Sequence, residues 1–208
     1  FDSFKDFITR VSVRKSKIAK NLYMSGGISY LNGGFVNGSE IFYRTSKIAG
    51  GDYAFVADKS AQNVGSKSPR IYYGADLQIT WENNIGKAEL RGEYITGTQS
   101  ATYNTSASPG TPPINKTLSP DSIFIRNFNG AYFYLNQTFF KRHQVFLKYD
   151  WYDPNIKIEG SGISASNYFG PSDIRYNTIG AGYIFYVNDN LKFVIYYDHP
   201  VNEKSGIQ

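Results

Sequence analysis

Charged side chains of opposite sign recur at every second residue in two segments of the chain. Glu89, Arg91 and Glu93 follow one another with this spacing, and so do Lys148 and Asp150. Alternate residues of a β-strand lie on the same face of a sheet, so each set would form a charged row. Such rows can line a water-filled passage, where rings of charge bias which ions pass. They can also simply join neighbouring strands through ion pairs, and both interpretations remain open.

The usual signatures of catalysis and metal binding are weak. The chain has two histidines: His143 falls in a short turn and His199 follows the last strand, with no evident serine or carboxylate to orient either. Asp150 and Asp153 are an odd number of residues apart, so a strand would place them on opposite faces. The chain has no cysteine, and its oxygen-rich segments lack the regular ligand spacing of a calcium loop. We therefore expect no enzymatic activity, no cofactor and no metal site.

The elements that must position these side chains are strands with strict alternation of apolar and polar residues. Residues 71–81 are the clearest case, with one dry and one wet face. The apolar positions in this segment are Ile71, Tyr73, Ala75, Leu77, Ile79 and Trp81. The alternation leaves one question, which is whether the dry face contacts a protein core or lipid.

The rest of the chain reads as a meander in which short and long connections alternate. We predict no helix, and about eight strands, several of them near the roughly 9–11 residues that span a tilted bilayer. Part of the first long connection, residues 39–45, could extend a strand. The predicted strands are residues 4–14, 21–33, 71–82, 88–94, 123–139, 144–153, 174–187 and 191–199, and the long connections are 34–69, 98–122 and 154–173.

Composition limits the classes of protein that fit. Hydrophobic residues make up 41% of the chain and aromatic residues 17%, with 18 tyrosines. No stretch approaches the roughly 18 consecutive apolar residues of a transmembrane helix. The net charge is +5, but we find no basic strip interleaved with aromatics and expect no nucleic acid partner. The cations gather in predicted turns, where they are either solvated or meet lipid phosphates: Arg14, Lys15, Lys17, Lys20, Lys141 and Arg142.

These patterns favour a membrane barrel over a soluble β-sandwich, which also alternates. Short turns at one end and long loops at the other are typical of outer-membrane barrels. The apolar faces carry aromatic residues near strand ends, namely Tyr30, Trp81, Trp151 and Tyr197, as interfacial girdles do. We therefore predict an all-β, antiparallel transmembrane β-barrel with short periplasmic turns and long extracellular loops.

Several segments resemble the phosphate-selective porin O and P family, in its branch from bacteria of the Bacteroides–Flavobacterium kind. The segment KYDWYDPN (148–155), followed by a Gly-Asn-Ser loop, is the most specific of them. The others are LRGEYITGTQ (90–99), FIRNFNGAYFY (124–134), DIRYNTIGAGYIF (173–185), FKDFITRVSV (4–13) and GISYLNGG (27–34). The resemblance covers most of the chain in order, apart from the long loops.

The resemblance implies a barrel of about sixteen or more strands in the outer membrane of a Gram-negative bacterium. Residues 1–208 would then be a single-domain portion of it, without an N-terminal part and without the closing C-terminal strand. Expected partners are outer-membrane lipid, small solutes or inorganic anions, and further copies in a homotrimer or a larger envelope complex.

The predicted function is passive diffusion of small solutes or ions through a water-filled barrel, with anions such as phosphate as candidates. The alternative is a barrel with a plugged lumen that serves as a structural or docking subunit of a larger assembly. Segment 34–69 is a candidate for a loop that folds inward and narrows the pore. The predicted pore-lining residues are Arg10, Asp76, Glu82, Glu89, Arg91, Glu93, Arg126, Lys148, Asp150, Lys192 and Asp198. Apart from Arg126, four of these are basic and six are acidic, so we expect a wall of mixed charge.

Overall fold

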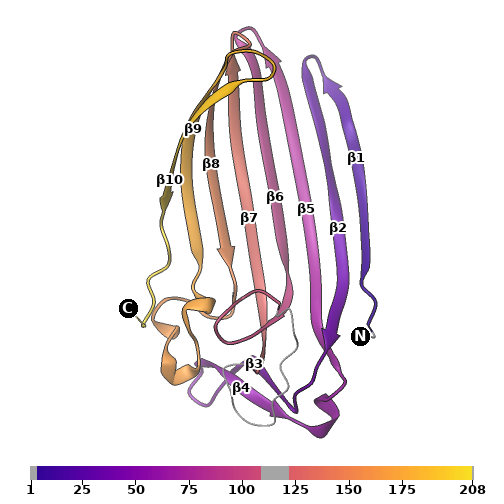
Figure 1. Cartoon of the computed structure of the whole chain (residues 1–208), viewed down its shortest axis with the longest axis vertical. Helices are drawn as coiled ribbons and strands as arrows, with labels where there is room; N and C mark the ends of the chain where they lie inside the picture. Colours follow the sequence, from indigo (N-terminus) through magenta and orange to yellow (C-terminus); the bar gives the residue numbers. More distant parts are fainter. Residues whose placement is uncertain (1–3, 109–121, 208) are drawn as a thin grey trace.

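The computed structural model describes residues 4–108 and 122–207, and it folds them into one sheet of ten strands (Figure 1). Eight strands follow the order β1-β2-β5-β6-β7-β8-β9-β10, each antiparallel to its neighbours. No helix in this part of the chain has the length and apolar character needed to cross a membrane. The strands are β1 (Phe7–Ala19), β2 (Leu22–Val36), β3 (Ile41–Lys47), β4 (Tyr53–Lys59), β5 (Lys67–Asn83), β6 (Gly86–Ala101), β7 (Ile123–Phe139), β8 (His143–Asp153), β9 (Tyr176–Tyr186) and β10 (Lys192–Pro200). The 3₁₀ helices are η1 (Ala61–Asn63), η2 (Gly160–Gly162), η3 (Ala165–Asn167) and η4 (Pro171–Asp173).

Short turns gather at one end of the sheet and the long connections at the other, as predicted (Figure 1). Both ends of the chain lie on the side of the long connections. The first short turn is tighter than predicted, because β1 continues to Ala19 and leaves only Lys20 and Asn21 between β1 and β2. Most of the basic residues assigned to that turn therefore lie on β1. The long loop predicted for 98–122 starts later, since β6 runs to Ala101, and its residues 109–121 lie outside the described residues.

Residues 39–45 do not extend β2, and the prediction that they continue a strand was wrong. They enter β3, which forms an antiparallel hairpin with β4. The hairpin then pairs with β7 in parallel, with Phe42 opposite Ile123 and Arg44 opposite Ile125. This site is free because β8 pairs with β7 only from Asn129 onward. The first residues of β7 would otherwise leave an open edge, and unpaired buried backbone groups are costly.

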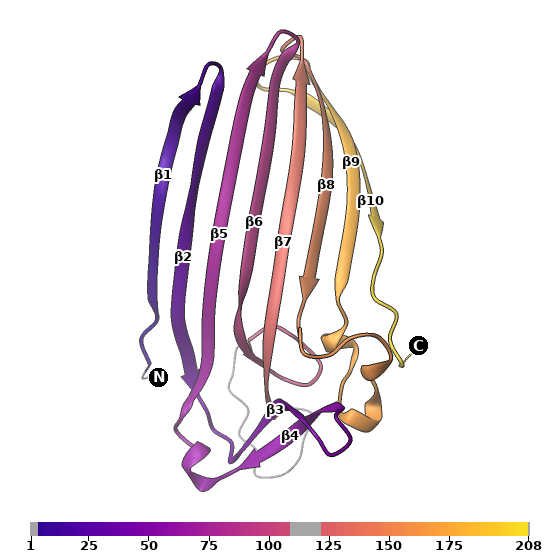
Figure 2. The same ribbon diagram turned by 180° about the vertical axis from the view of Figure 1, so that it is seen from behind.

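The sheet remains open in the described part of the chain. β1 pairs only with β2, and β10 pairs only with β9 (Figures 1 and 2). The structure is thus an all-β antiparallel meander, and closure into a barrel stays a prediction. An open edge of this length presents a row of unpaired N–H and C=O groups.

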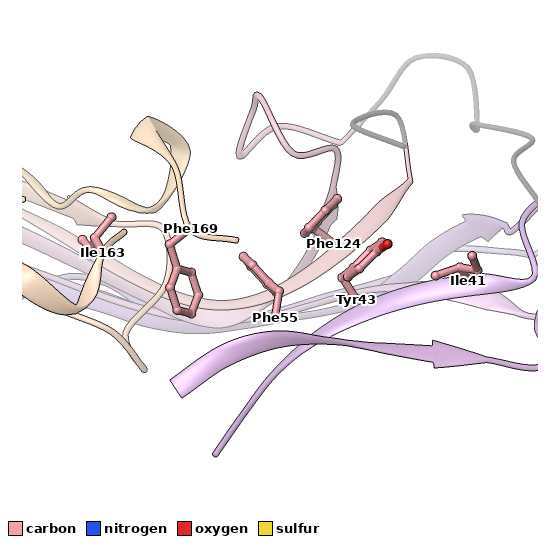
Figure 3. Packing of buried hydrophobic residues seen from close by; sticks show 6 residues of the cluster. All are labelled: Ile41, Tyr43, Phe55, Phe124, Ile163 and Phe169. Atoms are coloured by element: carbon pink, nitrogen blue, oxygen red, sulfur yellow. The ribbon is translucent and has the colours of Figure 1, made fainter. Parts of the chain in front are cut away.

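The main buried hydrophobic cluster lies at the end of the long connections and not between two layers. Tyr43 and Phe124 stack with ring centroids 4.3 Å apart, and Phe55 meets Phe124 edge-on at 4.9 Å (Figure 3). Phe169 and Ile163, both fully buried, complete it from the connection between β8 and β9. We call the segments that build this cluster, residues 41–59, 102–105 and 154–173, the loop-end cap.

Phe124→Ala is expected to lower the free energy of unfolding by about 3–5 kcal/mol, because a large buried ring leaves a cavity. Urea titration of the folded protein, followed by tryptophan fluorescence, measures the change. Phe140→Ala is the matched control, since that ring is 78% exposed in a short turn. Phe140→Ala should lower the free energy of unfolding by less than about 0.5 kcal/mol. Equal effects of the two substitutions would contradict the packing described for the cap.

Candidate functional site

The strand register places all of the predicted pore-lining residues on one face of the sheet, which we call the polar wall. Asp76 lies opposite Glu93, Glu93 opposite Tyr132, and Tyr132 opposite Asp150, so four strands contribute to one row. Because alternation is unbroken along these strands, the remaining predicted residues fall on the same face. Asp153 lies on the opposite face from Asp150, as its odd spacing predicts.

Two ion pairs of the polar wall reach across an intervening strand at a glycine. Arg10 on β1 pairs with Asp76 on β5 at 2.6 Å, and a Cβ on Gly27 of β2 would overlap the Arg10 guanidinium. Lys148 on β8 pairs with Asp198 on β10 at 3.1 Å, with Gly180 of β9 directly between them in register. The missing side chain leaves each pair room to meet above the middle strand. Glycine here therefore serves cross-strand pairing.

Further ion pairs and hydrogen bonds connect charges along single strands and to their neighbours. Arg91 contacts Glu89 at 2.8 Å, and Gln78 donates to the same carboxylate at 2.8 Å. The hydroxyl of Tyr132 donates to Glu93 at 3.1 Å. Lys148 also contacts Asp150 at 2.9 Å. Most charges of the wall are thus locally neutralised, which is the structural role weighed against ion selection above.

Two predicted wall residues stand apart from these pairs. Glu82 and Lys192 lie near the short-turn end, are exposed, and make no ion pair within residues 4–108 and 122–207. Their carboxylate and ammonium groups remain available to solvent ions. The short-turn end of the wall is therefore its least neutralised part.

Arg126 shares the polar face but is fully buried under the loop-end cap. Its Nε donates to Asp173 at 2.8 Å, and both side chains have zero exposure. The other guanidinium nitrogens donate to backbone carbonyls of Thr102, at 3.0 Å, and Tyr103, at 3.3 Å. The guanidinium also lies 5.2 Å from the ring centre of Phe55, within range of a cation–π contact.

Asp173 extends this network into the cap. Its carboxylate accepts from the side-chain amide of Asn155 at 3.0 Å and from the backbone N–H of Gly170 at 3.1 Å. Asn155 in turn donates to the hydroxyl of Thr45 on β3 at 3.2 Å. One guanidinium therefore joins β7 to all three long connections. We call this set, Arg126, Asp173, Asn155 and Thr45, the Arg126 hub.

Sequence reasoning missed the partners of Arg126 because they lie in aperiodic loops. Asp173 ends the segment Gly170-Pro171-Ser172-Asp173, in which the Gly-Pro pair is a local signal of a turn, and its carboxylate accepts from the backbone N–H of Gly170. Tyr43 also escaped notice. Burial raises the pKa of its hydroxyl, which has no hydrogen-bond partner among the described residues.

The two histidines lie on the apolar side of the sheet. His143 Nδ1 is 2.6 Å from the hydroxyl of Tyr183, and the His199 ring lies 6.5 Å from that of Tyr197. Within the described residues, no three potential ligands from His, Cys, Asp and Glu gather in one place. The absence of enzymatic activity stays a prediction.

Fold and wall together define the class of this protein. It is an all-β antiparallel meander with one apolar face, one face of paired charges, and a buried cap at one end. Comparisons with protein-family models, curated proteins and solved structures found no match for the chain. The resemblance to the porin O and P family therefore stays a prediction.

Arg126→Met is expected to destabilise the protein by about 3–5 kcal/mol, because it leaves the buried carboxylate of Asp173 without its cation. The double variant Arg126→Met/Asp173→Leu should lose less stability than the single variant, since it removes both buried charges. Urea titration measures the stability, and limited proteolysis measures whether residues 154–173 become cleavable.

Arg44→Met is the matched control for Arg126→Met. Arg44 forms an exposed pair with Asp58 at 3.8 Å, and exposed pairs contribute less than about 1 kcal/mol. If both arginine variants behave alike, the Arg126 hub does not hold the cap.

Proposed function

We propose that this chain is part of an outer-membrane β-barrel that works as a passive porin for small solutes or ions. The observation that carries the proposal is the uncovered apolar face of the sheet. Val11, Leu147 and Ile195 on this face are 69%, 59% and 74% exposed. Large apolar side chains on the other meander strands are exposed as well. Soluble monomers rarely expose contiguous apolar patches above a few hundred Å².

The height of the apolar face supports lipid as its partner. Residues 71–81 span about 34 Å at ~3.4 Å per residue, or ~26 Å when a strand tilts by ~40°. Outer-membrane barrels carry an apolar band about 25 Å tall. If a second protein layer covered this face instead, its height would not need to match the thickness of a membrane.

Aromatic residues border this face near both ends, as expected for an interface with water. Trp81 lies toward the short turns, while Tyr30 and Tyr73 meet at 5.1 Å toward the long connections. Trp151 keeps its ring on the apolar face and donates its Nε1–H to Asn129 at 2.9 Å. Rings that are apolar at one end and hydrogen-bonded at the other are favoured at lipid–water boundaries.

The polar wall supports a hydrated lumen on the other face. Its charges are mixed and largely paired, which favours general diffusion over a strict preference for phosphate. Rings of unpaired like charge would be needed at a constriction for strong selection.

Single-channel recording in planar bilayers tests the proposal directly. We expect stable open steps, and the reversal potential in a potassium chloride gradient gives the preferred ion sign. Added phosphate that blocks the current at low concentration would restore the family's anion preference. Insertion without any current would contradict the porin function.

A second candidate function is a docking subunit with a plugged lumen, because the loop-end cap packs on the polar wall around Phe124 and Arg126. The same recording separates the two candidates when Arg126→Met is included. A plugged barrel should stay silent in the wild type and conduct after the substitution loosens the cap.

Leu135→Arg is expected to lower the stability of the protein in phospholipid vesicles by about 2 kcal/mol, between the costs of a lipid-facing cation at the bilayer midplane and at the interface. Leu135 is 51% exposed on the apolar face. Asn136→Arg, the next residue on the same strand, faces the polar wall and should cost less than about 1 kcal/mol. Equal costs would show that lipid does not cover the apolar face.

A further inference from the structure

A hollow of about 870 Å³ lies on the polar wall over β6, β7, β8 and β9. Its volume falls in the range of small-molecule sites, roughly 300–1,000 Å³. The aromatic residues that border it from the polar face are Tyr132, Tyr134, Phe146, Tyr152 and Tyr186. So many rings on the wet face of a sheet are not needed to form a hydrated wall.

The rings form a connected row and not isolated contacts. Tyr132 and Tyr134 lie 5.7 Å apart between ring centres, and Tyr134 and Phe146 lie 6.3 Å apart. The Phe146 ring leans over Gly182 of the next strand, where a Cβ would overlap it. A ring that reaches over glycine in this way covers exposed backbone, and Phe146 also borders the hollow.

The charged groups that border the hollow do not suit an inorganic anion. They are Glu89, Glu93 and Asp150 with Arg91, and Lys148 lies beside them on Asp150, so the site has no surplus of positive charge. Arg91 pairs with Glu89 and Lys148 pairs with Asp150, whereas Glu93 accepts a hydrogen bond from the neutral hydroxyl of Tyr132. The ion pairs of two of these three carboxylates also weaken the case for a simple cation, which would need several free carboxylates.

Paired groups of this kind still have hydrogen-bonding capacity. An ionised carboxylate accepts about four hydrogen bonds and a guanidinium donates five, and the described contacts use only part of these. A fitting ligand therefore combines flat apolar C–H faces for the rings with many hydroxyl groups for the charged pairs. Pyranose sugars have this combination.

We propose that this aromatic hollow binds neutral oligosaccharides, with sugar rings stacked on Tyr134 and Phe146 and hydroxyls bound by Glu89, Arg91 and Glu93. The inference deepens the proposed porin function, on which it rests for its place in the lumen, by naming the class of solute.

Calorimetric titration of maltohexaose into the detergent-folded chain tests the site without any need for conductance. Phe146→Ala and Tyr134→Ala should each weaken binding about tenfold, the cost of one lost stacking platform. Tyr134→Phe keeps the ring and should bind within about twofold of the wild type. Tyr149→Ala is the matched control, because this ring lies on the same strand as Phe146 but on the apolar face, and it should leave binding unchanged.

Inorganic phosphate and spermidine are titrated alongside as an anion and a cation. No binding of maltohexaose, equal binding by the two alanine variants and the wild type, or tighter binding of phosphate or spermidine would overturn the inference. The recordings keep the two proposals apart. Open current without sugar binding refutes only the oligosaccharide site, whereas sugar binding without current refutes only the porin.

Discussion

The buried ion pair between Arg126 and Asp173 is the interaction on which the arrangement of the loop end depends. A guanidinium with zero exposure must be compensated, because an unpaired buried charge costs several kcal/mol. Here the compensation comes from one carboxylate and from carbonyls of a different connection. Satisfying one side chain therefore brings together segments that share no strand pairing. Arg126 therefore fixes the positions of Asp173, Thr102 and Tyr103 relative to β7.

The main hydrophobic core lies at the same end of the sheet as the Arg126–Asp173 pair. A sheet with one charged face and one exposed apolar face has no interior of its own. In residues 4–108 and 122–207, the main core forms where the β3–β4 hairpin fills the free edge of β7 and its rings meet Phe124. The meander strands are held chiefly by their ladders and by cross-strand pairs. The exposure of this apolar face is the observation behind the proposal that lipid covers it.

The polar wall shows how small residues shape a charged surface. Gly27 and Gly180 let ion pairs close over a middle strand, and Gly182 leaves room for the Phe146 ring. A glycine on the middle strand thus lets an ion pair form at two positions and makes room for an aromatic ring at a third. In the proposed porin, a wall built in this way would select solutes by shape and hydrogen bonding more than by net charge. The oligosaccharide proposal follows from this balance.

The sequence by itself determined the all-β antiparallel meander, the two faces of its strands and the segregation of short and long connections. Alternation with period two is a local property, so Glu89, Arg91 and Glu93 could be assigned to one face without knowing their neighbours. The same reasoning left the face of Arg126 ambiguous, which the register of β6 and β7 settles, and it could not find the partner of this side chain. It also misjudged residues 39–45, because a short strand can equally extend its predecessor or pair elsewhere.

Only the tertiary structure decided how the loop end is built. Arg126 and Asp173 are 47 residues apart, and Thr45 and Asn155 are 110 apart. Their side chains come from connections without periodicity, where no local pattern records a contact. Which loops meet depends on the edge that β8 leaves free on β7 and on the need to neutralise one buried guanidinium. Both are properties of the assembled sheet and not of any single segment.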